Sequence, residues 1–216
     1  MFRDREEAGE LLAEALEEHI NREKNPIILA IPRGGIPVAY KVAQKLKIPF
    51  SVIVVRKLGL PWNEEAGFGA IDPDGTPYYD RSVLGYLSEE EIRNVIEKEL
   101  KELREREKKF APKGYPNLRG RQVIIIDDGV ATGYTAIAAA GYAKKKGADE
   151  VIIAVPVCPS DAEARLLKYA DKFICYYPAD TPSFAVGMFY RDFHQLSDEE
   201  AREYLRKAEE EELLEP

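Results

Sequence analysis

Two adjacent aspartates stand directly after four branched apolar residues, and a loop rich in glycine and threonine follows them. The stretch VIIIDDGVATGYT covers residues 123–135, with the acids at Asp127 and Asp128. A glycine-rich turn that opens a helix presents several backbone N–H groups to one point, where the helix dipole favours an anion. Thr132 and Thr135 add hydroxyl donors. Because two carboxylates repel a bare polyphosphate, we expect them to face ribose-type hydroxyl groups while the loop binds a phosphate.

Other phosphate sites explain this stretch less well. No Gly-Lys-Ser/Thr follows it, so it is not a P-loop, and it lacks the GxGxxG of dinucleotide-binding folds. A receiver-domain or phosphatase pocket accounts for the two acids alone. Neither explains the glycines and basic residues that follow the upstream strands, so a sugar phosphate is the ligand that the pattern favours.

Three basic side chains follow two predicted strands upstream of the acids. Arg33 precedes two glycines in PRGGIPVA at the start of a helix, and Arg56 and Lys57 follow the apolar run 50–55. Glycine lets a backbone approach an anion closely, and arginine supplies a planar fork of donors. Singly, each is more commonly a solvated surface charge. Together, on one predicted rim with the phosphate-type loop, they predict a site for a second anionic group.

Continuous apolar strands alternate with helices, which predicts an α/β fold: a mostly parallel twisted sheet with helices on both faces. Ligands of such sheets lie beyond the carboxyl ends of the strands. The predicted strands are 27–31, 50–55, 123–126, 151–157 and 172–177. One predicted helix starts at the N-cap Asp4, and a second follows the glycines at 34–35 and ends near Leu46. Further helices are predicted over 88–110, 134–146 and about 160–169, and after the Ser197–Glu200 capping box.

We expect one domain over residues 1–216, with two additions to the sheet. The insertion 56–115 contains a loop with Pro61 and Trp62, a hairpin around 72–75, and a long helix with charged outer faces. The C-terminal region 178–216 is expected to form a hood and a final helix.

Composition narrows the classes of partner. The net charge is −8, and no apolar run is long enough to cross a bilayer, so we expect neither a nucleic-acid nor a membrane partner. The first twenty residues are charged and amphipathic without a signal-peptide core, which predicts a cytoplasmic protein. Cys158 and Cys175 have no metal or redox spacing and are expected to be buried free thiols.

The motif at 123–135 resembles the 13-residue signature of type I phosphoribosyltransferases, in which a strand, two acids and a Thr-Gly-x-Thr loop bind 5-phosphoribosyl-1-pyrophosphate. In the family's order, IPRGGIPVA resembles the pyrophosphate loop and RKLGLP the basic start of a flexible lid, so the similarity covers residues 27–157. More narrowly, FRDREEAGELLAEAL, VVRKLGLPWNEEAGFGAI and FAVGMFYRDF resemble a prokaryotic group of predicted phosphoribosyltransferases whose acceptor is unassigned.

The resemblance implies transfer of a phosphoribosyl group to a nitrogenous, nucleobase-like acceptor, with Mg²⁺ as cofactor and pyrophosphate as product. It assigns Asp127 and Asp128 to the ribose 2′- and 3′-hydroxyls and to the cationic transition state. It assigns the 5-phosphate to a loop that comprises Gly129, Val130, Ala131, Thr132, Gly133, Tyr134 and Thr135. A homodimer is also compatible with the resemblance.

The resemblance further assigns the pyrophosphate and its Mg²⁺ to Arg33, Gly34 and Gly35. Arg56 and Lys57 would neutralise the leaving pyrophosphate as a lid over 58–67 closes and excludes water. Asp127, Asp128, Arg33 and Lys57 are thus the expected catalytic residues. Mg²⁺ would reach Asp127 and Asp128 through the ligand, and Asp192 is either a further metal contact or a helix cap.

Two features of the sequence favour different acceptors. Members that act on 6-oxopurines carry an acid where this chain has Ala131, which weighs against hypoxanthine and guanine, whereas FAVGMFYRDF resembles the hood of those enzymes. The aromatic residues expected either to stack a flat base or to pack the core are Phe184, Phe189, Tyr190 and Phe193. His194 is a general base or a surface histidine. An alternative function is a non-catalytic sensor of phosphoribosyl pyrophosphate.

Overall fold

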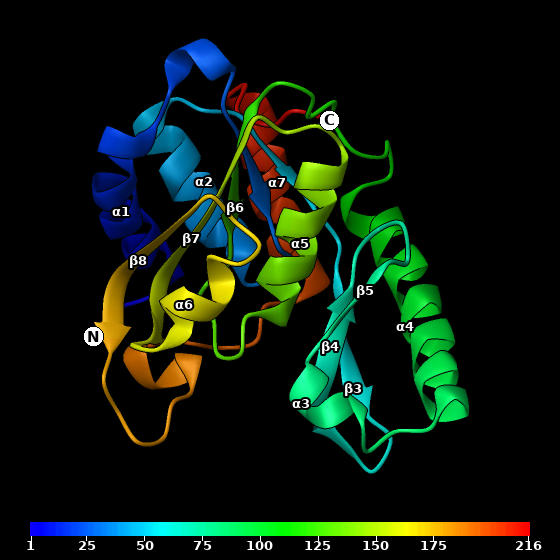
Figure 1. Ribbon diagram of the computed structural model, residues 1–216. Coiled ribbons are helices and arrows are strands. Elements are labelled where there is room, and N and C mark those ends of the chain that lie inside the picture. The colour runs from blue at the N-terminus through cyan, green and yellow to red at the C-terminus, as the bar shows by residue number, and fades with distance from the viewer.

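Five parallel strands form the central sheet of the computed structural model, which describes all 216 residues (Figure 1). Their order is β2-β1-β6-β7-β8. Their bounds are Phe50–Val52 for β2, Ile27–Ala30 for β1, Gln122–Ile126 for β6, Glu150–Pro159 for β7 and Lys172–Ala179 for β8. The chain order reverses between β1 and β6, where Ala30 pairs with Ile126. Their carboxyl ends therefore meet at the switch point where such sheets bind ligands.

Helices cover both faces of this sheet, as the continuous apolar strands predict. On one face, residues of α1 (Arg5–Leu16), α2 (Gly35–Leu46) and α7 (Asp198–Glu210) join the apolar cluster that contains Ile28 and Ile124. On the other face, α5 (Tyr134–Lys145) and α6 (Ala162–Leu166) pack with Leu29 and Ile125 (Figure 1). Alternate strand residues thus serve opposite faces, and both faces are dry.

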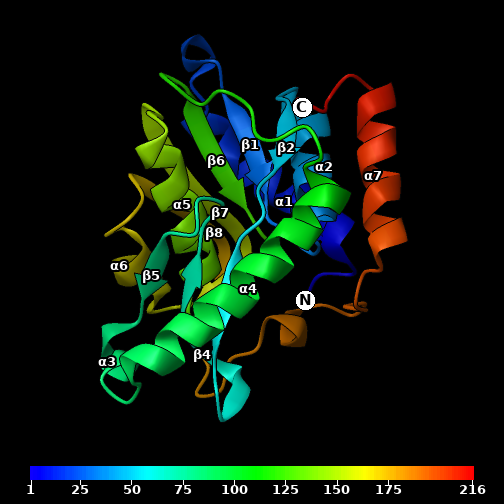
Figure 2. The ribbon, with the colours of Figure 1, turned by 90° about the vertical axis from the view of Figure 1, so that its right-hand side faces the viewer.

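A second, antiparallel sheet extends from one side of the first, in the order β3-β4-β5 (Figure 1). Its strands are β3 (Arg56–Leu60), β4 (Asn63–Ile71) and β5 (Pro77–Tyr79), followed by the short helix α3 (Arg81–Leu84). The long helix α4 (Glu89–Phe110) lies along β3, and its C-terminal end points toward β2 and α7 (Figure 2). The predicted turn around 72–75 connects β4 to β5 and is confirmed.

Two expectations for this region are wrong. The segment 58–67 is not a loop, because β3 and β4 pair across it as a hairpin. The strand expected over 50–55 pairs only at 50–52, since its partner β1 ends at Ala30. Residues 53–55 are nevertheless buried, which explains their apolar sequence. Arg56 and Lys57 consequently begin a strand of the second sheet and do not follow a strand of the first.

The helix predictions hold at their starts and less well at their ends. The Ser88–Glu91 and Ser197–Glu200 capping boxes form with both reciprocal hydrogen bonds, and Asp4 caps α1 through the Glu7 amide. The first helix ends at Leu16 in a 3-10 turn, η1 (Glu17–His19), and a second such turn, η2 (Arg22–Lys24), precedes β1. The helix expected over 160–169 has only the five residues of α6.

N-terminal residues pack against the segment after β8, and we call these two parts together the hood. Phe2 bridges to Tyr190, and the short helix η3 (Val186–Phe189) precedes this contact. A separate apolar cluster around Phe2, Val157 and Tyr190 joins the hood to β7. None of the helices has the length and apolar character needed to cross a membrane.

Candidate active site

The loops after β1 and β6 lie against each other at the switch point. A Cβ atom on Gly34 would come within 2.1 Å of the Asp128 Oδ2 atom, and one on Gly35 within 2.7 Å of the Ile126 carbonyl oxygen. Only glycine permits this approach. The peptide bond between Pro32 and Arg33 is cis. The two motifs, at residues 33–35 and 127–135, therefore form one surface although some ninety residues separate them in the sequence.

Asp127 and Asp128 occupy the centre of this surface and are largely buried. Asp128 Oδ2 accepts a hydrogen bond from Arg5 Nε at 3.0 Å, and its carbonyl oxygen accepts one from the Tyr190 hydroxyl at 2.6 Å. Asp127 Oδ1 accepts from the Asp128 amide at 2.8 Å. Burial raises the pKa of Asp127 well above its ordinary value, and the charge of Asp128 adds to this. Such a pair gains from hydroxyl donors or positive charge placed beside it.

Burial also raises the pKa of the Asp128 carboxyl, although the Arg5 guanidinium opposes the shift. Arg5 is the first residue of α1, and its side chain is only 9% exposed. It also donates to the His194 carbonyl oxygen at 2.9 Å and lies 4.2 Å from the Phe193 ring centre. Arg5 therefore joins the acids to the hood.

Sequence reasoning did not find Arg5. It stands among charged residues of an amphipathic helix, where one arginine resembles its solvated neighbours. Its partner is 123 positions away, so no local spacing marks the pair. In the sequence, only the resemblance of the whole segment FRDREEAG to a family motif indicates that Arg5 has a role.

The residues 131–136, which we call the amide loop, present free backbone donors beside the acids. None of their six N–H groups donates to a protein atom, whereas the preceding Val130 N–H is bound to the Val157 carbonyl oxygen. Gly133 has φ of +89° at the N-cap of α5, and no side chain caps this helix. Free amides at a helix start bind anions through the amides and the helix dipole.

Arg165 of α6 holds the amide loop from behind. Its guanidinium donates to the Thr132 carbonyl oxygen at 2.6 Å and to the Ala131 carbonyl oxygen at 3.2 Å. The side chain of Ala131 and that of Thr132 are exposed, and Tyr134 and Thr135 are half-buried. Two carbonyl groups of the loop are thus fixed while its N–H groups have no protein partner, and a positive charge lies close by.

Arg33 and Arg56 are each bound to a carboxylate of the protein, whereas Lys57 is bound within its own hairpin. Arg33 Nη1 binds Asp198 Oδ1 at 3.1 Å, and Arg56 binds Glu99 Oε2 of α4 at 3.2 Å. Lys57 donates to the Glu65 carbonyl oxygen within the β3–β4 hairpin. The expected binding of one anionic group by Arg33, Arg56 and Lys57 stays a prediction.

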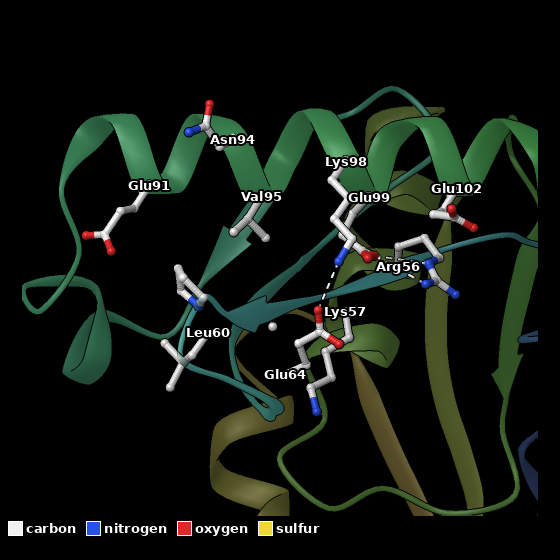
Figure 3. A pocket seen from close by; sticks show the side chains of 12 residues that line it. Arg56, Lys57, Leu60, Glu64, Glu91, Asn94, Val95, Lys98, Glu99 and Glu102 are labelled. Atoms are coloured by element: carbon white, nitrogen blue, oxygen red, sulfur yellow. Dashed lines mark hydrogen bonds and ion pairs between the residues drawn. The ribbon is translucent and has the colours of Figure 1, made fainter.

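A groove of about 560 Å³ runs between the β3–β4 hairpin and α4, with Arg56 at one end (Figure 3). Its walls carry mainly charged side chains, and the ion pairs Arg56–Glu99 and Lys98–Glu64 cross it (Figure 3). Trp62, in the turn of this hairpin, is 59% exposed. The groove is therefore lined by residues of the hairpin and of α4.

In the hood, Asp192 binds a histidine and does not join the two central acids. His194 Nδ1 lies 2.8 Å from Asp192 Oδ1, and His194 Nε2 lies 2.8 Å from Glu200 Oε2. These carboxylates raise the pKa of the exposed His194. No group of three or more His, Cys, Asp or Glu side chains in the chain is arranged to hold a metal ion. Any Mg²⁺ here would depend on ligand atoms as well as on Asp127 and Asp128.

The hood aromatics pack mainly against one another. The ring centres of Tyr190 and Phe193 are 4.9 Å apart, and those of Phe184 and Phe189 are 5.3 Å apart. Tyr190 is buried and holds the Asp128 carbonyl group, so its role is at least partly structural. Of the two thiols, Cys158 is buried and Cys175 half-buried, and both are free as expected.

Comparison with known proteins places this arrangement in a family. A model of the phosphoribosyl transferase domain matches residues 3–191. Two Mycobacterium tuberculosis proteins, each named "Putative phosphoribosyl transferase", are 42% identical over an alignment 214 residues long, which covers 96% of this chain and 47% of each relative. The chain therefore spans about half the length of the curated relatives it matches.

Solved structures agree. The TT1426 protein from Thermus thermophilus is 34% identical, with a TM-score of 0.78 over 95% of this chain and 98% of that one. A Neisseria gonorrhoeae protein whose crystal structure contains bound ppGpp shares the fold, at 15% identity and a TM-score of 0.50 over 98% of this chain and 96% of that one. The family model matches most of this chain, and the two motif loops meet at the switch point. This chain therefore belongs to the phosphoribosyl transferase family.

Proposed function

We propose that the chain transfers the phosphoribosyl group of 5-phosphoribosyl-1-pyrophosphate to a nitrogenous, nucleobase-like acceptor and releases pyrophosphate. The observation that carries this proposal is the juxtaposition of two buried carboxylates with the six free N–H groups of the amide loop. One side of the surface suits hydroxyl groups and positive charge, and the other suits a phosphate. A ribose 5-phosphate presents both.

The donor is proposed to lie across the switch point. Asp127 and Asp128 would accept hydrogen bonds from the ribose hydroxyls, and the amide loop with the Thr132 and Thr135 hydroxyls would bind the 5-phosphate. The diphosphate would lie toward Gly34, Gly35 and the arginines. The residues proposed to line the 5-phosphate site are Gly129, Val130, Ala131, Thr132, Gly133, Tyr134 and Thr135.

Charge separation dictates the roles of these residues in the reaction. As the bond between ribose C1 and the diphosphate oxygen breaks, the diphosphate leaves with the electron pair and the sugar becomes cationic. Asp127 and Asp128 stabilise that cation, while Arg33 and Arg56 neutralise the leaving group. The acceptor nitrogen then supplies the electron pair of the new C1–N bond. Lys57 joins the diphosphate only if the hairpin moves.

The donor set fits Mg²⁺ as the cofactor. Two oxygen-bearing acids with raised pKa values, and only one guanidinium partner between them, gain from a nearby hard cation. Bound to the diphosphate, Mg²⁺ neutralises charge and activates the leaving group. We propose that it is held mainly by the donor's own oxygens, with Asp127 and Asp128 contributing through the ribose.

The β3–β4 hairpin is proposed as the lid. It carries Lys57 and the exposed Trp62, and the groove behind it leaves room for a change of angle against α4. Closure would exclude water, which would otherwise capture the ribosyl cation. The acceptor would enter under the hood, where the exposed methyl group at Ala131 offers no acid to a 6-oxopurine.

Pyrophosphate release across a panel of purines, pyrimidines and other amine or phosphate-ester acceptors tests this function. We expect Mg²⁺-dependent release with at least one acceptor, and its loss in the double variant Asp127→Asn, Asp128→Asn. Asp149→Asn, at an exposed ion pair with Lys24, is the control and should retain activity. Donor binding without release across the panel would favour a sensor, and absence of donor binding would contradict both functions.

A further inference from the structure

The inward face of α4 contains one arginine that no motif marks. Leu103 and Phe110 are buried, and their spacing places Arg106 on the same side of the helix, between them. Arg106 is half-buried, whereas Arg104, two residues earlier, is exposed and paired with Glu107 at 2.8 Å. Removing a guanidinium from water costs free energy unless the group is paired. An arginine on the inward side of a helix is therefore expected to have an anionic partner.

The neighbours of Arg106 along this face connect it to the candidate active site. Two turns earlier on α4, Glu99 binds Arg56, and three residues later Lys109 binds Asp198 at 2.8 Å. The same Asp198 binds Arg33 of the loop after β1. Arg106 therefore lies between Glu99, which binds Arg56, and Lys109, which binds the same Asp198 as Arg33. We call Arg33, Arg56, Arg106 and Lys109 the basic cluster.

Charge in the basic cluster is not balanced. Its four cations share the bound carboxylates of Glu99 and Asp198, and no ion pair or side-chain hydrogen bond reaches Arg106. Burial and the charges of Arg56 and Arg33 lower the pKa of Arg106, while Asp198 and the exposed Glu102 oppose this only in part. Positive charge of this density is satisfied by a multivalent anion.

We propose that Arg106 is a third arginine of the diphosphate subsite and binds the same diphosphate as Arg33 and Arg56, once Asp198 and Glu99 release those two side chains. This inference rests on the proposed function, because that function supplies the diphosphate. The ligand class is a diphosphate, either inorganic or attached to a sugar. Arginine suits this position because its planar fork meets two phosphate oxygens at once.

Calorimetric binding of inorganic pyrophosphate with Mg²⁺, and separately of ribose 5-phosphate, tests the inference. Arg106→Gln should weaken pyrophosphate binding by about 10- to 100-fold, as expected for the loss of a charge-assisted contact, and leave ribose 5-phosphate binding unchanged. Arg104→Gln, on the exposed face of the same helix, should change neither. Pyrophosphate affinity in Arg106→Gln equal to that of the wild type, or an equal loss for both ligands, would overturn the inference.

Two further outcomes are decisive. If Arg106→Gln does not fold, Arg106→Lys carries the test, because it keeps the charge but loses the fork; we expect at least about a threefold loss of pyrophosphate affinity, and none overturns the inference. Wild-type protein that binds pyrophosphate through Arg106 but not ribose 5-phosphate would contradict the proposed function alone. Wild-type protein that does not bind pyrophosphate would overturn the diphosphate subsite itself.

Discussion

The amide loop and the basic cluster face the same switch point but differ in what their polar groups bind. The amide loop leaves its six N–H groups without a protein partner and is held only through its carbonyl groups by Arg165. In the basic cluster, Arg33 and Arg56 are each bound to a carboxylate of the protein. In the proposed function, one anion site is therefore preformed and open, whereas the other is occupied by carboxylates of the protein.

The difference follows from the energetic cost of each kind of donor. An exposed neutral N–H group is satisfied by water, so a loop can present several at little cost. Clustered guanidiniums repel one another and lose hydration when half-buried, so carboxylates must offset them. We infer that the amide loop binds without rearrangement, while the basic cluster exchanges carboxylate partners for a diphosphate.

The largest effect is expected from Gly133→Ala, which distorts the amide loop. Because Gly133 has φ of +89° and a Cβ atom there would lie 2.8 Å from Leu166 Cδ2, the loop must shift. We expect ribose 5-phosphate affinity to fall by about 10- to 100-fold, as misplacement of binding groups does, with pyrophosphate affinity retained. Calorimetry with each ligand measures both.

Gly120→Ala is the matched control for this change. Gly120 has φ of +73° with no atom within 4 Å of the added Cβ, so it carries a similar backbone cost away from the site. It should lower stability without changing affinity. Equal ribose 5-phosphate affinities for the two variants would show that the amide loop is not the phosphate site.

The next largest effect concerns the buried carboxyl of Asp127. Burial raises the pKa of Asp127 above its ordinary value of 3.8, so the folded protein keeps a proton that the unfolded chain releases. Stability due to this carboxyl therefore falls as pH rises from about its ordinary pKa through the raised one. Asp127→Asn should raise the melting temperature at pH 7.5 by about 2–4 °C, as removal of an active-site charge often does.

The advantage of Asp127→Asn should vanish near pH 4, where both side chains are neutral. Melting curves of wild type and variant across this range measure it. The exposed Asp149→Asn serves as the control and should show no such pH-dependent gain. A variant that is less stable than the wild type at pH 7.5 would mean that the Asp127 charge stabilises the fold.

A smaller effect is expected from Glu99→Gln in the basic cluster. Loss of the Glu99 charge frees Arg56, so pyrophosphate should bind about two- to fivefold more tightly, the range of a modest ion pair. Glu105→Gln, at an exposed pair with Lys108 on the same helix, should have no effect. Weaker pyrophosphate binding in Glu99→Gln would show that Glu99 positions Arg56 and does not compete for it.

The smallest signal is spectroscopic. Trp62 is the only tryptophan and is 59% exposed, so closure of the hairpin over a diphosphate should shift its emission to shorter wavelength. Phosphoribosyl pyrophosphate with Mg²⁺ should produce the shift, whereas ribose 5-phosphate, which reaches the amide loop alone, should not. Unchanged emission at saturating donor would remove the hairpin from the role of lid.

Local patterns predicted much of this fold. The apolar runs at 27–31 and 123–126 became β1 and β6, and both capping boxes formed, because strands and helix starts depend on neighbours within four residues. The hairpin β3–β4 was missed, since its charged residues and glycines do not alternate as a half-buried strand does. For the same reason, Arg56 and Lys57 were expected to follow a strand of the first sheet, whereas they begin β3 of the second.

Short motifs predicted the acids, the glycines and the amide loop, because the spacing within each motif defines its backbone. No motif predicted which charges meet in the folded chain: Arg5 binds Asp128 across 123 positions, and Arg33 binds Asp198 across 165. Such pairs depend on how the helices pack on the sheet, and any of the many charges of this chain could have filled them. Packing, and no local pattern, left Arg106 without a partner beside the site.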